Sequence, residues 1–297
     1  MGKAPILPSG HLCVTFTKNL LMDPQPANPI PPKTGRNLSG LGAAAQRAAV
    51  RLLAVICASA TRHLLQQLLP DTAGLRCLHW GCGSGEETFL LSSLLTEESS
   101  WWAIDEDPVL IEAALQQEAR HSGASVHFAQ SFLSDWRPER PYDIIFSGPR
   151  ALPLPQLRVG LADLQRLLKK GGALIVAAFP FSGWRAYPYN YAFASAVDLI
   201  GRLEESRSSE VQQLPELLKR NGFTAIETLY APPAFIPRTG NRIASLFLES
   251  CREEFLQRQW SNREELNALL EELREFEQRE DTLISRPGVH LMLARKT

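Results

Sequence analysis

Residues 75–85 read LRCLHWGCGSG, a short apolar run that ends in three alternating glycines. The apolar run predicts a β-strand, and Glu86 to Leu95 follow it with the pattern of a helix. Glycines are needed at such a strand-to-helix turn where the backbone takes positive φ values, or where a ligand approaches more closely than a Cβ permits. The stretch therefore predicts a ligand-binding turn, and a tight turn without a ligand is the alternative.

A second strand, WWAID, ends about 20 residues later in Ala103-Ile104-Asp105-Glu106-Asp107. Carboxylates at a strand tip can accept hydrogen bonds from both hydroxyls of a ribose. A glycine turn beside an acidic strand tip predicts a nucleoside-binding crevice.

After Pro70, short β-rich runs alternate with helical stretches. This alternation predicts βαβ units on a parallel sheet, because each right-handed crossover helix covers one face of it. The runs are almost continuously apolar, as in strands buried on both faces. We expect a doubly wound α/β domain whose strands are LRCLHW, WWAID, VHFAQ, YDIIFS, GALIVAAF, FTAIETLYA and VHLMLARK.

The chain divides into residues 1–70 and residues 71–297. Residues 1–38 are rich in proline and predict an arm, whereas Ser39 to Pro70 carry apolar residues at helical spacing and predict a helical cap. Within the α/β part, long connections predict an inserted helical lid at about 180–216 and a helical insertion at about 241–280.

The composition of the chain argues against several classes of partner. The 31 Lys and Arg nearly balance the 32 Asp and Glu, so nothing global favours nucleic acid or an anionic membrane as partner. Seven basic residues against one acid in the first 70 are read as a solvated face. The five scattered cysteines and the lack of a signal peptide or membrane-spanning run predict a soluble, cytoplasmic protein without disulfides or metal. The expected partner is a small molecule, and a homodimer stays open.

The spacing GxGxG, in place of GxGxxG, resembles the glycine motif of class I S-adenosylmethionine-dependent methyltransferases. The resemblance extends over roughly residues 70–297 and includes YDIIFS at 142–147, LLKKGGAL at 167–174 and the closing stretch from Asp281 to Lys296. It implies a Rossmann-like seven-stranded sheet, with the methionine part of the cofactor above the turn and its ribose on the next acid. The implied cofactor-binding residues are His79, Gly81, Cys82, Gly83, Gly85, Asp105, Glu106, Ser131, Phe132 and Ser147.

Two positions depart from the family. His79 stands where the family has an acid for the cofactor's ammonium, and Ser131 or Phe132 stands where an Asp often meets the adenine amino group. A neutral imidazole accepts one hydrogen bond, but a protonated one would repel the cationic cofactor, so affinity would fall below about pH 6.5. A structural strand-end histidine is the alternative.

The acceptor side is suggested by the aromatic residues after the fifth strand. Trp184, Arg185, Tyr187 and Tyr191, with Tyr189 between the tyrosines, suit a planar or carboxylate-bearing small molecule, although lid aromatics can equally pack on the core. The residues after the fourth strand, Ser147-Gly148-Pro149-Arg150, lack the Asn-Pro-Pro-Tyr type of signature, and no catalytic residue is identified.

We therefore expect a methyltransferase that acts on an oxygen, nitrogen or carbon of a small molecule. The alternative is a protein of the same fold without methyl transfer, acting as a cyclase-like catalyst or as a binding partner. A macromolecule methylase is the third possibility.

Overall fold

A computed structural model describes residues 40–118, 124–148, 154–179, 184–236 and 238–297. The expected proline-rich arm, residues 1–38, lies outside the described residues. The expected cap is one helix, α1 (Gly40–Leu68). Seven of its buried residues recur every three or four positions, which is the spacing of one helical face: Ala45, Ala49, Leu53, Cys57, Ala60, Leu64 and Leu68.

The main sheet has seven strands in the order β3-β2-β1-β4-β5-β10-β7, which confirms the predicted sheet. One feature differs from the expected parallel sheet, because β10 runs antiparallel to both β5 and β7. The helical insertion returns the chain at the edge where β7 ends, with Val289 opposite Ala231, so the last strand runs in reverse. The strands are β1 (Arg76–Trp80), β2 (Ser100–Asp105), β3 (Ser125–Gln130), β4 (Tyr142–Ser147), β5 (Leu168–Ala178), β7 (Phe223–Ala231) and β10 (Val289–Lys296).

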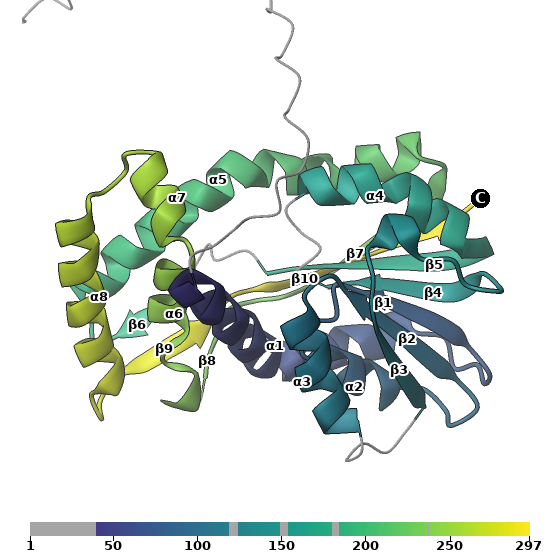
Figure 1. Ribbon diagram of the computed structural model, residues 1–297, viewed down its shortest axis with the longest axis horizontal. Helices are drawn as coiled ribbons and strands as arrows, with labels where there is room; N and C mark the ends of the chain where they lie inside the picture. The colour runs from purple at the N-terminus through teal and green to yellow at the C-terminus, as the bar shows by residue number, and fades with distance from the viewer. Residues whose placement is uncertain (1–39, 119–123, 149–153, 180–183, 237) are drawn as a thin grey trace, which may run out of the picture. The chain divides into compact units, whose positions relative to one another are not determined.

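Helices cover both faces of this sheet (Figure 1). One layer contains α1, α2 (Glu86–Ser92) and α3 (Pro108–Glu118). The other contains α4 (Leu154–Leu167) and α5 (Tyr191–Arg220). The central strands β1, β4 and β5 are apolar because helices bury both of their faces, whereas β3 and β7 at the two ends of the sheet are largely exposed.

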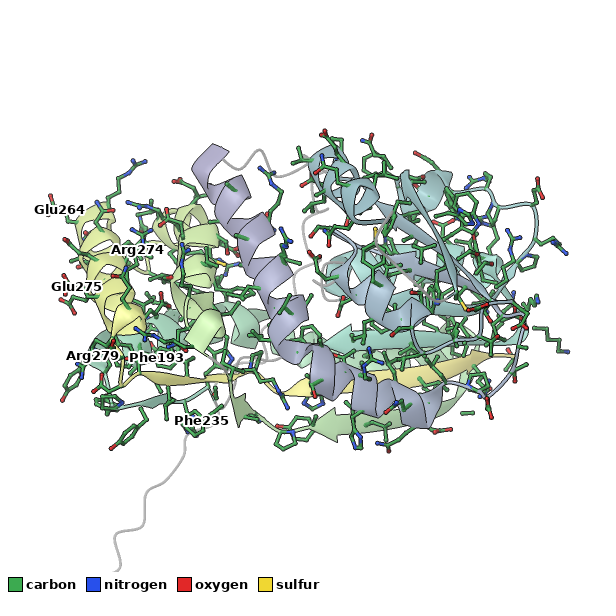
Figure 2. All side chains as sticks on the ribbon, turned by 90° about the horizontal axis from the view of Figure 1, so that it is seen from below. Phe193, Phe235, Glu264, Arg274, Glu275 and Arg279 are labelled. Carbon is green, nitrogen blue, oxygen red and sulfur yellow. The ribbon has the colours of Figure 1, made fainter. Side chains whose placement is uncertain are left out.

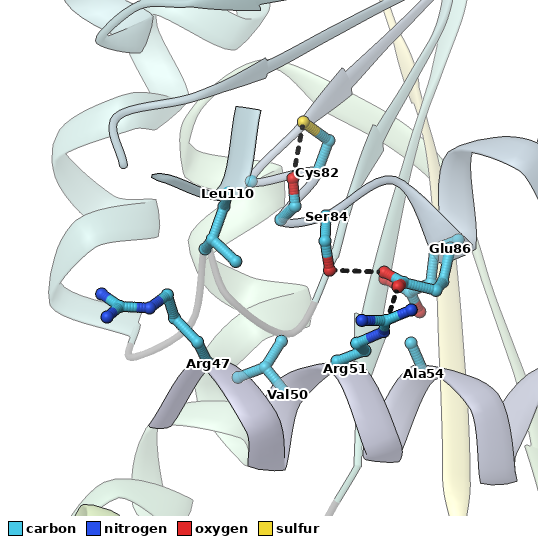
Figure 3. Close-up of a pocket in the computed structure, with 11 residues that line it drawn as sticks. Arg47, Val50, Arg51, Ala54, Cys82, Ser84, Glu86 and Leu110 are labelled. Carbon is cyan, nitrogen blue, oxygen red and sulfur yellow. Dashed lines mark hydrogen bonds and ion pairs between the residues drawn. The ribbon is translucent and has the colours of Figure 1, made fainter. Parts of the chain in front are cut away.

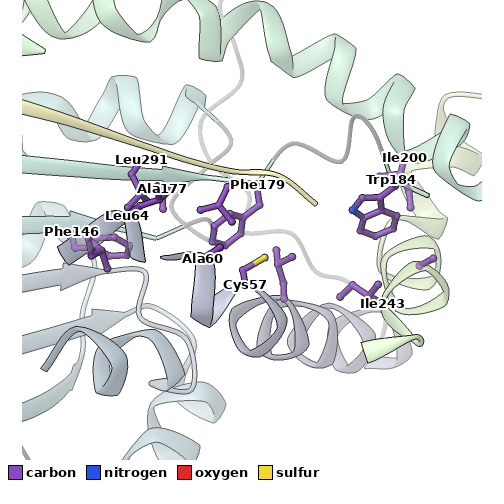
Figure 4. Packing of buried hydrophobic residues seen from close by; sticks show 14 of the residues in the cluster. Cys57, Ala60, Leu64, Phe146, Ala177, Phe179, Trp184, Ile200, Ile243 and Leu291 are labelled. Carbon is purple, nitrogen blue, oxygen red and sulfur yellow. The ribbon is translucent and has the colours of Figure 1, made fainter. Parts of the chain in front are cut away.

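The core under α1 joins the sheet to the insertions (Figure 4). Cys57 and Leu64 of α1 belong to the same buried cluster as Phe146 of β4 and Leu291 of β10. Trp184, which precedes the short strand β6 (Ala186–Tyr187), belongs to this cluster too. The cap is therefore part of the core of the α/β domain.

The insertion between β7 and β10 is helical, as its sequence predicts, with α6 (Ile243–Ser250), α7 (Arg252–Gln257) and α8 (Arg263–Gln278). Asn262 and Glu265 form a capping box that fixes the start of α8. The apolar stripe of α8 is buried at Leu266, Leu270, Leu273 and Phe276, while charged side chains such as Glu264 and Glu275 point outward (Figure 2). The sequence did not predict the second sheet, β6-β9-β8, or the two 3₁₀ turns; the bounds are β8 (Ala234–Phe235), β9 (Leu283–Arg286), η1 (Leu133–Asp135) and η3 (Arg238–Gly240).

The segment Ala44–Leu68 of α1 is long and apolar enough to cross a membrane by length and composition alone. The sequence analysis did not expect such a segment. A core helix of a soluble protein passes the same test, and one face of α1 packs in the core described above.

Candidate functional site

The glycine turn joins β1 to α2 at the carboxyl edge of the sheet. Gly85 is the residue before the first turn of α2 and has φ 92°, a left-handed value that glycine adopts without strain. A Cβ at this position would lie 2.9 Å from the ring of Phe128. The turn therefore needs glycine for its conformation and for its packing against β3.

Asp105 ties the end of β2 to this turn. Its Oδ2 accepts a hydrogen bond from the Gly83 amide at 2.9 Å, and its Oδ1 accepts one from the Asp107 amide at 3.0 Å. The side chain is buried, at 3% exposure. A carboxylate oxygen can accept more than one hydrogen bond, so an acid that holds the turn can also bind a ligand hydroxyl.

Helix α1 lies across the glycine turn and encloses a small cleft (Figure 3). The cleft has a volume of about 10 Å³, room for about one water molecule. The glycine spacing predicted the turn, but it did not predict the residues that α1 places opposite it. The lining residues are Arg47, Val50, Arg51 and Ala54 of α1, then Gly81, Cys82, Gly83, Ser84, Glu86 and Glu87, and finally Leu110 of α3.

Two arginines of α1 that line the cleft pair with acids, one inside the cleft and one beside it. Arg51 Nε lies 2.8 Å from Glu86 Oε1, and Arg47 Nη1 lies 3.6 Å from Asp107 Oδ2. The basic surplus near the N-terminus was expected to be a solvated face; these two residues also line the cleft, although the Arg51 side chain is still 59% exposed. A signal was present, because arginines four positions apart share one face of a helix.

His79 is fully buried at the end of β1. Its Nδ1 lies 2.8 Å from the Thr88 hydroxyl, and its Nε2 has no hydrogen-bond partner among the described residues. Burial lowers the pKa of His79 to about 3. The imidazole is therefore neutral at physiological pH, and the expectation that it titrates near pH 6.5 and then repels the cofactor is wrong.

Glu87, in the first turn of α2, is the acid nearest to His79. Its Oε2 lies 4.0 Å from His79 Nε2, and its Oε1 has no hydrogen-bond partner in the part of the chain that the structure describes. Burial, together with the charge of Glu86, raises the pKa of Glu87 to about 8. Both partners are therefore neutral at pH 7, and the contact is not an ion pair.

The end of β4 completes this polar group. A Cβ at Gly148 would lie 2.9 Å from Glu87 Oε2 and 3.0 Å from His79 Nε2, so only glycine leaves these atoms uncovered. The Ser147 hydroxyl beside it is buried and, within the described ranges, makes no hydrogen bond. Three buried polar atoms without partners thus occur at the adjoining ends of β1 and β4 and in the helix that follows β1, and buried polar groups of this kind normally bond to protein, to water or to a ligand.

The other predicted cofactor residues lie at the ends of β2 and β3. Ser131 donates its amide to the Asp105 carbonyl at 3.0 Å, which places it next to the acid. The Phe132 ring is 56% exposed, and Glu106 is exposed with its carbonyl bonded to Gln130. Cys82 is buried in the turn, where its amide donates to the Ile104 carbonyl. The structure brings these residues to the same edge, and their contact with a cofactor stays a prediction.

The predicted acceptor residues are not brought together in the same way. Trp184 is buried at 2% exposure and its ring stacks on Phe193 at a centroid distance of 6.2 Å, which agrees with the packing alternative. Tyr187 and Tyr191 are 64% and 78% exposed. They and Arg185 lie outside the set of residues that line the cleft.

A larger cavity, about 220 Å³, lies at the opposite edge of the sheet and is lined by Leu75, Lys169 and Arg295 among others. Its acid, Asp143, is satisfied by the Arg76 amide at 2.9 Å and by Lys169 Nζ at 2.6 Å. Ligands of open α/β sheets bind outside the carboxyl ends of the strands. We therefore take the small cleft, and not the larger cavity, as the candidate site.

Residues 77–172 match the family model described as "Methyltransferase domain". A malonyl-[acyl-carrier protein] O-methyltransferase of Paenibacillus sp. (strain JDR-2) is 28% identical over 157 residues, which cover 51% of this chain and 56% of that protein. The chain thus spans little more than half the length of this curated relative.

Solved structures show the same fold. The YcgJ protein of Bacillus subtilis is 15% identical, with a TM-score of 0.50 over 80% of this chain and 98% of that chain. A phosphoethanolamine N-methyltransferase 2 of Haemonchus contortus, in complex with S-adenosylhomocysteine, is 18% identical over 79% of this chain and 51% of that chain, with a TM-score of 0.45. Residues 77–172 thus match a methyltransferase domain, and the seven-stranded sheet with its antiparallel β10 agrees with the Rossmann-like fold of class I S-adenosylmethionine-dependent methyltransferases.

Proposed function

We propose that the protein binds S-adenosylmethionine in the cleft under α1 and transfers its methyl group to a small-molecule acceptor. The observation that supports this most is the glycine turn, whose Gly83 amide is bonded to Asp105 at the tip of the next strand. The turn and the acid both lie within the matched methyltransferase domain, residues 77–172.

The chemistry of the cleft fits this cofactor. The buried oxygen atoms of Glu87 and Ser147 that lack partners offer acceptors for an ammonium group, and Asp105 offers lone pairs to ribose hydroxyls. The exposed ring of Phe132, beside Asp105 at the end of β3, can stack on an adenine in place of the missing Asp.

The volume of the cleft does not fit, because about 10 Å³ holds a water molecule and not a nucleoside. Binding therefore requires α1 or the side chains of Arg47, Val50 and Arg51 to move away from the glycine turn. Since α1 packs directly over the turn, its return would exclude water from the bound cofactor.

When bound, the cofactor supplies an electrophilic methyl group on a sulfonium. The chain's own contribution is to bind, to orient and to exclude water, because alignment of nucleophile, methyl and sulfur is the main requirement of this transfer. No residue of the described cleft is assigned as a general base. The proposal therefore rests on proximity and enclosure.

A small-molecule acceptor is favoured by the enclosure of the cleft and by the net charge of -1. Nucleic-acid methylation would need a basic surface along the cleft, whereas here Arg47 and Arg51 pair with Asp107 and Glu86. The replacement of the family's acid by His79 supports the second candidate, a protein that binds the cofactor without methyl transfer.

The test uses S-adenosylmethionine with a radiolabelled methyl group, incubated with the protein and with small-molecule and macromolecular fractions of a cell extract. We expect the label to pass to the small-molecule fraction. Label in protein or nucleic acid would contradict a small-molecule acceptor. Tight cofactor binding without any transfer would favour the binding protein.

A further inference from the structure

We propose that Glu87 is the residue that holds the cofactor's ammonium group, in place of the acid that the family has at the position of His79. The inference rests on the proposed function and adds to it a residue that the family motif does not contain. The acid has moved from the end of β1 to the first turn of the next helix, α2.

The first argument is geometric. Glu87 lines the cleft, is buried, and has one carboxyl oxygen, Oε1, without a hydrogen-bond partner among the residues that the structure describes. Its other oxygen lies 4.0 Å from His79 Nε2, so Glu87 occupies the space next to the family's position. A side chain at Gly148 would press on this pair, since a Cβ there would be 2.9 Å from Glu87 Oε2.

The second argument concerns the charges around Glu87. On its own helix Glu86 is an acid, and that acid is already paired with Arg51 of α1. His79 of β1 is neutral, and Cys57 of α1 is a neutral thiol because burial raises its pKa to about 12. Arg286 at the end of β9 influences Cys57, but among the described residues neither it nor any other Lys or Arg forms an ion pair with Glu87. A cationic group of a ligand would therefore be the first positive charge paired with this carboxyl.

The third argument concerns the proton that Glu87 must lose when the ligand binds. Without a cation, burial keeps Glu87 protonated up to a pKa of about 8. An ammonium group donates a hydrogen bond to a carboxylate but not usefully to a carboxylic O–H. Binding therefore expels the carboxyl proton to solvent, so that about one proton is released for each cofactor bound near pH 7.

The experiment is calorimetry with two ligands and three proteins. S-adenosylhomocysteine carries the amino-acid part and cannot transfer a methyl group, whereas 5′-methylthioadenosine lacks the amino-acid part. The proteins are the wild type, Glu87→Gln and Glu277→Gln. Glu277 is the matched control, because it is a second buried carboxyl whose pKa is raised, to about 7, but it does not line the cleft.

For the wild type we expect S-adenosylhomocysteine affinity to rise about 20-fold from pH 6 to 7.5, since the ionised form of Glu87 is the one that binds. Proton release, obtained from buffers of different ionisation enthalpy, should be close to one at pH 6.5. Glu87→Gln should weaken S-adenosylhomocysteine about tenfold at pH 7.5, remove the proton release and the pH dependence, and leave 5′-methylthioadenosine unchanged. Glu277→Gln should behave as the wild type does.

Equal S-adenosylhomocysteine affinity in Glu87→Gln, or tight wild-type binding with no proton release, would overturn the inference and leave the proposed function standing. Failure of the wild type to bind either ligand would overturn both. The wild-type proton release needs no variant, so it decides the question even if Glu87→Gln does not fold.

Discussion

Asp143 and Glu87 are carboxyl groups at opposite edges of the same sheet, and their surroundings differ in kind. At the amino edge, Asp143 accepts a backbone amide and a lysine, and it borders a cavity of about 220 Å³. At the carboxyl edge, Glu87 has no donor on Oε1 among the described residues, and it borders a cleft of about 10 Å³. The larger space has satisfied polar groups, and the smaller one has unsatisfied groups. Unmet hydrogen-bonding capacity, and not empty volume, therefore marks the site.

The largest expected effect is the loss of ligand affinity when an acid is removed from the carboxyl edge of the sheet. Asp105→Ala should weaken S-adenosylhomocysteine binding more than 100-fold, because two charge-assisted hydrogen bonds of about 1.5 to 3 kcal/mol each are lost. It should also lower the free energy of unfolding by about 2 kcal/mol, since the Gly83 and Asp107 amides lose their acceptor. Calorimetry and urea unfolding measure the two effects.

Asp143→Ala is the control for this prediction. It removes an acceptor from the Arg76 amide, so stability should also fall by about 2 kcal/mol, while the affinity should not change. If Asp143→Ala weakens binding as much as Asp105→Ala does, the ligand does not select the carboxyl edge.

The next effect concerns stability and pH without ligand. The pKa of Glu87 is raised from 4.5 to about 8 in the folded protein, so the unfolded chain loses this proton first as pH rises. The wild type should therefore lose a few kcal/mol of stability between about pH 4.5 and 8, and Glu87→Gln should lose less. Urea unfolding across this range measures the difference. Parallel curves for the two proteins would show that Glu87 ionises normally.

A smaller effect compares two glycines with left-handed φ values, Gly85 at the carboxyl edge and Gly171 at the amino edge. Alanine costs about 1 to 2 kcal/mol at either position because of the backbone. Gly85→Ala should cost more, because its Cβ would lie 2.9 Å from Phe128, whereas nothing lies within 4 Å of a Cβ at Gly171. Thermal unfolding measures both losses of stability. Equal losses would mean that the Phe128 ring can move aside at no cost in free energy.

The smallest effect concerns α1. Arg51 is more than half exposed and its pair with Glu86 contributes at most about 1 kcal/mol. Arg51→Gln should hardly change stability, but should weaken S-adenosylhomocysteine a few-fold if this guanidinium faces the cofactor's carboxylate. Arg62→Gln on the same helix, whose Arg62 is bonded to Ser93 outside the cleft, should have no effect on binding. Equal affinities of the two variants for S-adenosylhomocysteine would show that Arg51 of α1 does not contribute to binding.

The sequence predicted the elements that depend on local patterns. Apolar runs and glycine spacing identified the strands, the turn at Gly81 to Gly85 and the acid Asp105, because these follow from backbone geometry and side-chain periodicity. The direction of β10 and the cover of the turn by α1 depend on long-range packing, which no local pattern records. His79 was assigned an ordinary pKa because burial cannot be read from a strand end, and Glu87 was missed because an acid in a first helical turn is usually an exposed one.

The central claim is that the cofactor binds at the carboxyl edge with its ammonium group on Glu87. A crystal structure of the protein with S-adenosylhomocysteine tests it most directly. We predict density between the glycine turn and a displaced α1, with the ligand nitrogen about 3 Å from a Glu87 carboxyl oxygen. Ligand density in the amino-edge cavity beside Lys169, or an ammonium bound at this edge without Glu87, would contradict the account.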